Sequence, residues 1–256
     1  MVLVDLHCHL LPGIDDGSKD WNTSLDLARQ AVENGVTHAL LTPHHLNGRY
    51  VNHKADVIAL TAEFQQRLAQ EQIPLTVFAG QEVRMSGGLL PALDQGDLLF
   101  ADEGNRYLML EFPSEDVPSY AANVVFQLRQ NGVIPVIVHP ERNARILARP
   151  KTLQEFLEQG CLTLQTASSY MGTFGSKVER LTKRLIEAGQ GCVFASDAHD
   201  LPQRQYELRQ ALDKLETKEG EAVAQTYRNN ARAILNGETP IFDWQPLKAN
   251  RFWHLP

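Results

Sequence analysis

Short runs of apolar and β-branched residues recur along the chain, and amphipathic patterns with a helical period lie between them. Seven such runs occupy residues 2–9, 37–45, 75–83, 107–113, 133–141, 161–169 and 191–199. Helical patterns occupy, among others, residues 23–35, 120–132, 152–160 and 178–189, and each of these ends at a glycine. A glycine there is typical of the left-handed residue that ends a helix before a strand. Continuous apolar strands that alternate with helices predict an α/β fold with parallel strands and helical crossovers.

The number of predicted strands favours a closed (β/α) barrel over an open sheet, although a doubly wound sheet has the same local pattern. No Pro- or Ser-rich linker and no low-complexity segment divides the chain. We therefore expect a single domain over residues 1–256, a length that α/β barrels commonly reach. Residues from about 240 to 256 break the rhythm, and we expect them to form a C-terminal tail on the surface of the body.

Residue types that bind metal ions stand where most of the predicted strands end. His7 and His9 close the first run, and they point to the same face because alternate residues of a strand do so. Five of the other six runs end with His44 and His45, Glu82, Glu111, His139, and Asp197 with His199. In parallel α/β proteins the functional residues lie at these carboxyl ends. One strand-end carboxylate is usually a cap or a solvated loop residue, but so many together indicate a polynuclear metal centre.

The candidate ligands are His7, His9, Asp16, His44, Glu82, Glu111, His139, Asp197 and His199. This set is too large for one ion, and it suits two or three divalent cations with Glu82 as a bridge. Imidazole and carboxylate donors without thiolate fit Mn, Fe or Zn better than Ca or Mg. Paired metals about 3.5–4 Å apart favour displacement at phosphorus, so we expect hydrolysis of a phosphate ester. Asp5 lies on the same strand face, either as a partner of an imidazole or as a buried structural carboxylate.

Arginines follow two of these strand ends and are candidates to bind a phosphoryl group. Arg142 follows His139 within the segment HPERN, and Arg204 lies just beyond the segment SDAH. Each could instead form a surface salt bridge. Arg84, two residues after Glu82, is a further candidate on the same strand face.

Composition excludes several other classes of protein. A net charge of −7 and a pI near 5.7 argue against a protein that mainly grips nucleic acid backbones. Three widely spaced cysteines without CxxC, none with an arginine six positions later, exclude a disulfide framework, a thiolate zinc site and a cysteine phosphatase. No phosphate-binding GxxxxGK[ST] loop or GxSxG nucleophile motif is present.

We expect no signal peptide and no membrane span, and hence a cytoplasmic protein. His38, His53 and His254 fall outside the strand-end pattern and are expected to be packing or surface residues.

The segments DLHCHLLPGIDDG, TPHHLNGRY, GQEVR, LEFP, HPERN and SDAH resemble the polymerase-and-histidinol-phosphatase (PHP) family. They are most similar to the bacterial manganese-dependent protein-tyrosine phosphatases encoded in capsule and exopolysaccharide loci. The resemblance runs in order from Val4 to about Arg204, which is most of the chain. It implies a distorted seven-stranded (β/α) TIM-like barrel with three Mn²⁺ ions. The implied substrate is the phosphotyrosine cluster of a membrane-associated bacterial tyrosine kinase.

The resemblance also implies a grouping of the ligands. His7, His9 and Asp197 would hold one ion with Glu82 bridging, Glu82, Glu111 and His139 the second, and Asp16, His44 and His199 the third. Asp16 rather than Asp15 matches the family pattern because it immediately precedes Gly17. Arg142 and Arg204 match arginines that bind the phosphoryl group. A metal-bridging hydroxide would attack phosphorus, and His199 or Asp197 could protonate the leaving group if it needs a proton.

Other functions remain compatible with the sequence. A histidinol-phosphate phosphatase would share the metal site and differ in its substrate loops. A TatD-like deoxyribonuclease also begins with a segment similar to HCHL, although an Asp-x-His motif and an acidic chain argue against it. A binding module that has lost catalysis is a further alternative, and the complete ligand set argues against that as well.

Overall fold

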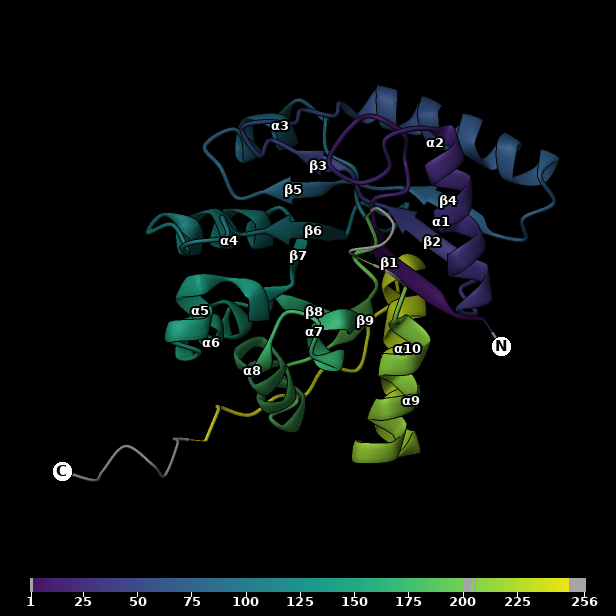
Figure 1. Ribbon diagram of the computed structural model, residues 1–256. Helices are drawn as coiled ribbons and strands as arrows, with labels where there is room; N and C mark the ends of the chain where they lie inside the picture. The colour runs from purple at the N-terminus through teal and green to yellow at the C-terminus, as the bar shows by residue number, and fades with distance from the viewer. Residues whose placement is uncertain (1, 200–203, 205, 249–256) are drawn as a thin grey trace.

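A computed structural model describes residues 2–199, 204 and 206–248, and its strands all pair in parallel (Figure 1). Within these ranges the strands are β1 (Val4–Cys8), β2 (His38–Leu41), β3 (His44–His45), β4 (Thr76–Ala79), β5 (Glu82–Arg84), β6 (Tyr107–Glu111), β7 (Ile134–Val138), β8 (Leu162–Thr166) and β9 (Val193–Ala195). Their order is β1-β2-β4 in one sheet and β3-β5-β6-β7-β8-β9 in the other. Each predicted apolar run contains a strand, and the prediction of a parallel α/β fold is confirmed.

Two of the predicted runs are interrupted rather than continuous. Thr42 and Pro43 separate β2 from β3, and Gly80 and Gln81 separate β4 from β5. Proline cannot donate a ladder hydrogen bond, and glycine weakens a strand interior, so both are common where a strand bends. The two interruptions lie side by side, because β2 pairs with β4 and β3 pairs with β5. The sequence pattern did not reveal this shared break.

The first and last strands meet through the segment that follows β9. Cys8 bridges to Ala198 in parallel, and the Asp197 amide donates to the His7 carbonyl over 2.8 Å. The His9 amide likewise donates to the Ala198 carbonyl over 2.8 Å. This contact places the end of β1 beside the end of β9, in the middle of the molecule in Figure 1.

The helices cover the outer faces of these strands. They are α1 (Trp21–Glu33), α2 (Lys54–Gln70), α3 (Leu89–Asp94), α4 (Ala121–Gln130), α5 (Ala144–Ala148), α6 (Lys151–Glu158), α7 (Ala167–Met171), α8 (Ser176–Glu187), α9 (Leu208–Glu219) and α10 (Glu221–Leu235), with a 3-10 turn at Pro140–Arg142. The four predicted glycine caps, Gly35, Gly132, Gly160 and Gly189, all have positive φ values. Within the described ranges, every helix is too short or too polar to cross a bilayer.

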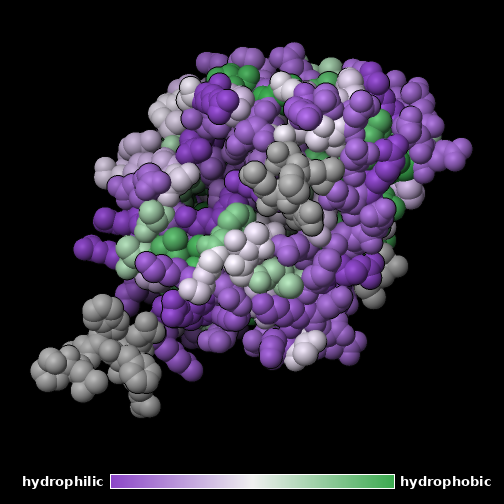
Figure 2. Space-filling view, viewed as in Figure 1, coloured by the Kyte–Doolittle hydropathy of each residue, from purple (hydrophilic) through white to green (hydrophobic). Residues whose placement is uncertain are grey.

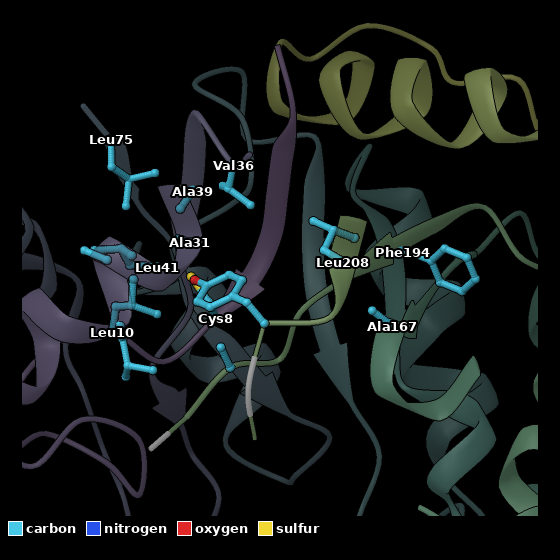
Figure 3. Close-up of a cluster of buried hydrophobic side chains, with 14 of the residues drawn as sticks. Cys8, Leu10, Ala31, Val36, Ala39, Leu41, Leu75, Ala167, Phe194 and Leu208 are labelled. Carbon is cyan, nitrogen blue, oxygen red and sulfur yellow. The ribbon is translucent and has the colours of Figure 1, made fainter. Parts of the chain in front are cut away.

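The interior is apolar, whereas the face drawn in Figure 2 is mostly hydrophilic. One core cluster joins β1, α1, β2 and α9, and Figure 3 shows Leu10, Leu41 and Leu208 within it. The three cysteines, Cys8, Cys161 and Cys192, are buried free thiols. They therefore act as packing residues.

The described part of the C-terminal tail follows the surface of the body. Asn230 exchanges two hydrogen bonds with the backbone of Ile241, of 2.7 and 2.8 Å. The Gln245 amide donates to the Ala188 carbonyl over 2.8 Å. The rest of the predicted tail, including His254, lies outside the described residues.

Candidate metal centre

The nine predicted ligands converge at the carboxyl ends of the strands. Eight of them are buried, and Asp16 is exposed. Four groups bring their donor atoms within 4.8 Å of one another: His7, His9 and Asp197; His7, Glu82 and His139; His44, Glu82 and Glu111; and His9, Asp16, His44 and His199. Residues separated by almost 200 positions in the sequence therefore share one site.

The tightest of these arrangements surrounds His7 Nε2 and His9 Nε2, which lie 3.4 Å apart. Asp197 Oδ1 is 3.3 Å from His7 Nε2 and 3.7 Å from His9 Nε2, and Glu82 Oε2 is 3.7 Å and 3.3 Å from the same two atoms. Ligands about 2.1 Å from one ion at tetrahedral angles lie roughly 3.4 Å apart. The spacing of these four donor atoms therefore fits a single cation among them.

Glu82 reaches two groups of imidazoles with its two oxygen atoms. Its Oε1 is 2.7 Å from His139 Nε2, and its Oε2 is 2.8 Å from His44 Nδ1. Glu111 Oε2 lies 3.7 Å from His44 Nδ1 and 2.7 Å from Arg84 Nε. Glu111 is thus grouped with His44, whereas the resemblance placed it with His139. The central position of Glu82 is the one expected of a bridging carboxylate.

Asp16 joins the remaining imidazoles at the exposed side of the centre. Its Oδ1 is 3.2 Å from His44 Nε2 and 3.6 Å from His199 Nε2. The rings of His9 and His199 stack with their centroids 4.0 Å apart. Because His44 directs Nε2 to Asp16 and Nδ1 to Glu82, its ring stands between two of the groups.

Several ligand atoms are buried without a hydrogen-bond partner among the described residues. They are His44 Nδ1, Glu82 Oε2, Glu111 Oε2, Asp197 Oδ1 and Asp197 Oδ2. Glu111 Oε2 and Asp197 Oδ2 face Arg84 and Arg142, and the other three atoms face neighbouring imidazole or carboxylate atoms of the same cluster. Buried polar atoms normally have hydrogen-bond partners, so this concentration of donor atoms around one point fits a bound cation. The residues present therefore fit a centre that holds divalent metal ions.

The carboxylates around His9 and His44 raise the pKa of both imidazoles. Burial by itself lowers these pKa values, but Asp15 raises the pKa of His9 to about 9. Glu82, together with other carboxylates, raises the pKa of His44 to about 11. Both rings would thus be protonated, positively charged imidazolium groups at neutral pH when no cation is bound in place of the second proton.

Glu111 and His139 are instead both shifted toward their uncharged forms. Burial and the neighbouring charge of Glu82 raise the pKa of Glu111 to about 8. Burial and the guanidinium of Arg142 lower the pKa of His139 to about 4. His139 is therefore a neutral imidazole at pH 7, the form that binds a metal.

Backbone strain accompanies two of the ligands. His139 has a φ of 36° and Asp197 a φ of 51°, values that residues other than glycine rarely adopt. His139 directly follows β7, and Asp197 lies two residues after the end of β9. Both residues turn away from the extended conformation at that point. Strained backbone of this kind is concentrated at functional sites.

Sequence reasoning missed the role of Asp15. Asp15 Oδ2 lies 2.7 Å from His9 Nδ1 and accepts the His44 amide over 3.2 Å, while Oδ1 accepts the Gly17 amide. Paired acidic residues before a glycine were visible in the sequence, but a pattern does not say which carboxylate faces a ligand. Asp15 therefore holds an imidazole, and Asp16 faces the centre.

Asp5 does not contact an imidazole. Its Oδ2 accepts from the Ser196 hydroxyl over 2.6 Å, and its Oδ1 accepts from the Ser196 amide over 2.9 Å. Of the two interpretations left open by the sequence, the structural carboxylate is the one observed. His7 Nδ1 instead lies 3.2 Å from Thr42 Oγ1.

Two predicted arginines face the centre. Arg142 Nη1 is 2.5 Å from Asp197 Oδ2, and the guanidinium lies 4.9 Å from the centre of the Phe174 ring. Arg204 Nη1 lies 2.9 Å from His199 Nε2 and 3.8 Å from Asp197 Oδ2. Arg84 is paired with Glu111, as described above. The two candidate phosphate-binding arginines therefore converge on Asp197.

A cavity of about 340 Å³ opens at the candidate metal ligands. Its lining includes Asp16, His44, Glu82, Arg84, Glu111, His139, Arg142, Asp197, His199 and Arg204, together with Asn47, Arg49, Tyr50, Phe112, Ser114, Val138, Pro140 and Asn143. A cavity of this size is typical of sites for small ligands or single side chains. The predicted packing histidines lie outside it: His38 stacks on Phe78, and His53 pairs with Asp97 over 2.6 Å.

Comparisons with known proteins agree over nearly the whole chain. The family model described as capsular polysaccharide synthesis, CpsB/CapC, matches residues 3–236. The tyrosine-protein phosphatase YwqE of Bacillus subtilis is 37% identical over 97% of each chain, and the putative tyrosine-protein phosphatase CapC of Staphylococcus aureus is 33% identical over 92% of each.

The chain is also similar to proteins of known structure. A structure from a study of YwqE of Bacillus subtilis and CpsB of Streptococcus pneumoniae, described as unique metal-dependent tyrosine phosphatases, superposes with a TM-score of 0.92. That match is 37% identical and covers 96% of this chain and all of the other. An organophosphorus hydrolase from Deinococcus radiodurans has a TM-score of 0.52 at 12% identity, which shows a likeness in fold alone.

Proposed function

Because the chain belongs to the CpsB/CapC family of capsular polysaccharide synthesis proteins, we propose that it is a metal-dependent protein-tyrosine phosphatase. The observation that carries this proposal is the convergence of buried imidazole and carboxylate atoms with two arginines at one cavity. Such a site favours hydrolysis of a phosphate monoester, because it neutralises charge on the phosphoryl oxygens. The names of the relatives with 37% and 33% identity support phosphotyrosine as the substrate.

Three Mn²⁺ ions are part of this proposal, with Fe or Zn as alternatives. His7, His9 and Asp197 would hold one ion with Glu82 bridging, Glu82, Glu111 and His139 the second, and Asp16, His44 and His199 the third. This is the grouping that the resemblance implies, although Glu111 Oε2 also lies 3.7 Å from His44 Nδ1. Divalent ions bound there supply a hydroxide nucleophile at neutral pH and neutralise charge on the phosphoryl oxygens. The donor spacing of 3.3–3.7 Å around His7 and His9 supports the first of these sites.

The arginines of the chain would bind the phosphoryl group. Arg142 is held by the carboxylate of Asp197 and by the face of Phe174, so its guanidinium is fixed in place before substrate arrives. Arg204 approaches the same carboxylate from the neighbouring loop. A planar guanidinium can donate two parallel hydrogen bonds to phosphate oxygens, which orients the group as well as binding it.

The groups near the leaving oxygen favour departure of a phenolate. Burial raises the pKa of Asp197, but Arg142 and His7 outweigh it and hold this pKa well below its usual range. Burial and the neighbouring His9 lower the pKa of His199. Neither side chain therefore carries a proton to donate at neutral pH. A tyrosine leaving group, with a pKa of about 10, needs such help less than the alkoxide of serine or threonine does.

The finer features of the prediction belong to the same proposal. The nine strand segments would act as seven strands of a distorted barrel, since each interrupted pair continues one predicted run. The chain would form one domain that works in the cytoplasm. Its protein substrate would be the phosphorylated tail of a bacterial tyrosine kinase that controls capsule or exopolysaccharide synthesis.

The test is phosphate release by metal-stripped protein, with and without added Mn²⁺. A phosphotyrosine peptide, histidinol phosphate and a phosphodiester should be assayed side by side. Release that depends on Mn²⁺ and favours the phosphotyrosine peptide is the expected result. A preference for histidinol phosphate or for the diester would keep the metal site and reject the substrate. Inactivity with every metal and substrate would reject the enzyme itself.

A further inference from the structure

Tyr50 stands at the rim of the cavity, in the loop between β3 and α2. Its side chain is half-buried and lines the cavity together with Arg49 and Asn47. The ring lies nearly parallel to the imidazole of His44, with an angle of 7° and centroids 6.2 Å apart. The Arg49 guanidinium carbon is 4.9 Å from the centre of the same ring. An aromatic surface is therefore placed directly beside a proposed metal ligand.

The loop that carries Tyr50 is held in one conformation. Asn47 Oδ1 accepts the amides of Arg49 and Tyr50 over 3.0 and 2.7 Å. Asn52 Nδ2 donates to the carbonyl of His44 over 2.8 Å and to that of Ile14 over 3.0 Å. Hydrogen bonds from asparagine side chains to the backbone stabilise a loop in the way that backbone hydrogen bonds stabilise a turn. The position of the Tyr50 ring is thus prepared before any ligand binds.

The composition of the cavity changes with depth. Glu82 and Asp197, at its floor, are about 1% exposed, whereas Tyr50 is half-buried. Phe112 and Pro140 add apolar surface to the lining. Most of the lining is polar, and Tyr50 is its half-buried aromatic side chain. A ligand that places a phosphoryl group near Glu82 and Asp197 can bring its next atoms against this ring. A phenyl ring would gain binding free energy by burying apolar surface against Tyr50, whereas a short polar alkyl chain would not.

We propose that Tyr50 determines substrate specificity by contacting the phenyl ring of a phosphotyrosine side chain. This inference rests on the proposed function, and it names a residue that selects aryl over alkyl phosphates at that site. The ring of the substrate lies against Tyr50 while its phosphoryl group reaches Arg142 and Arg204. The competing role for Tyr50 is to support His44 through their stacked rings, and the two roles differ in their effect on alkyl ligands.

The experiment compares the binding of two non-hydrolysable ligands to Mn²⁺-loaded protein by calorimetry. Benzylphosphonate carries an aromatic ring at the distance found in a phenyl phosphate, and methylphosphonate carries none. Tyr50→Leu should weaken benzylphosphonate about tenfold and leave methylphosphonate and the Mn²⁺ content unchanged. Tyr50→Phe keeps the ring and should bind both ligands as the wild type does. Val51→Ala, an exposed apolar residue next in the chain, is the matched control.

Four outcomes would overturn the inference. They are equal weakening of both ligands, unaltered binding of both ligands to Tyr50→Leu, loss of Mn²⁺ from Tyr50→Leu, and a wild type that binds benzylphosphonate no more tightly than methylphosphonate. Hydrolysis separates this inference from the proposed function. Wild-type protein that prefers benzylphosphonate but fails to hydrolyse a phosphotyrosine peptide would reject the function alone. Wild-type protein that hydrolyses the peptide, with Tyr50→Leu unaltered on both ligands, would reject the inference alone.

Discussion

Asp15 Oδ2 lies 2.7 Å from His9 Nδ1, and this contact decides which nitrogen of the His9 ring faces the other ligands. With Nδ1 donating to the carboxylate, Nε2 faces His7, Glu82 and Asp197 and is the nitrogen that offers a lone pair to a cation once the ring has lost its second proton. A carboxylate behind a ligating imidazole fixes its orientation and makes it a better donor. Asp15 is therefore needed for the centre although it is not one of the predicted ligands.

Asp15→Ala should weaken Mn²⁺ binding about 10- to 100-fold, because His9 loses the partner that orients it. A competition titration with a metal indicator measures the effect. Asp15→Asn is a second variant that preserves the size of the side chain but keeps only one acceptor oxygen. It therefore cannot accept from both the Gly17 amide and His9 Nδ1, and it should also weaken Mn²⁺ binding. Asp26→Ala, on the exposed face of α1, is the control. Unaltered affinity in a folded Asp15→Ala protein would contradict this role.

Replacing Glu82 should remove activity together with bound metal. Glu82→Gln keeps the volume of the side chain but loses the charge that links His139 with His44, and kcat/KM should fall by at least about a thousandfold. Elemental analysis and thermal unfolding would show a metal-depleted but folded protein. Glu63→Gln, on the exposed face of α2, should behave as the wild type. A fully active, metal-replete Glu82→Gln protein would exclude Glu82 from the centre.

Arg142→Lys should lower kcat/KM about 10²- to 10³-fold and weaken inhibition by inorganic phosphate. Lysine retains the charge but lacks the paired donors, and it cannot stack on Phe174 in the same way. Arg204→Lys should have a smaller effect, since its side chain is 34% exposed compared with 19% for Arg142. Arg145→Lys is a control on the neighbouring helix. Inhibition by phosphate that is identical in all three variants would argue against a phosphate-binding role.

Metal binding should release protons and become tighter as the pH rises. Without metal, the pKa values of about 9 for His9, about 11 for His44 and about 8 for Glu111 leave all three groups largely protonated at pH 7. A cation requires their deprotonated forms, so protons compete with it below these pKa values. Calorimetry in two buffers of different ionisation enthalpy measures the released protons. Identical heats in both buffers would contradict the expectation.

The three thiols should be unreactive in the folded protein. Burial raises the pKa of Cys161 to about 12 and raises the pKa values of Cys8 and Cys192 well above their usual range. Because the thiolate is the reactive form, a disulfide reagent at pH 8 should label none of them until the chain is unfolded. Rapid labelling of one thiol in the native protein would show that its surroundings open, and activity that falls with labelling would contradict a purely structural role.

The sequence determined the parallel α/β architecture and the residue types at the candidate site, because both follow from local patterns of residues. Apolar runs that alternate with helical periods are set by neighbouring residues, and each of the seven runs became strand. Alternation within a strand brings His7 and His9 to one face, and parallel strands must end at the same edge. The ligands Glu82, Asp197 and His199 could therefore be assigned to one site from their positions alone.

The tertiary structure decided what depends on register between distant segments. Asp5 contacts Ser196, which is 191 residues away, and Glu111 groups with His44 instead of His139. The path of the loop after β1 also decided that Asp15, and not Asp16, holds the imidazole of His9. These contacts are set by strand pairing and loop conformation over long distances, which no period in the sequence records. The sequence by itself determined which residue types end the strands and hence which residues are candidate ligands, and only the packing of the whole chain decided how they face one another and that Asp15 holds His9.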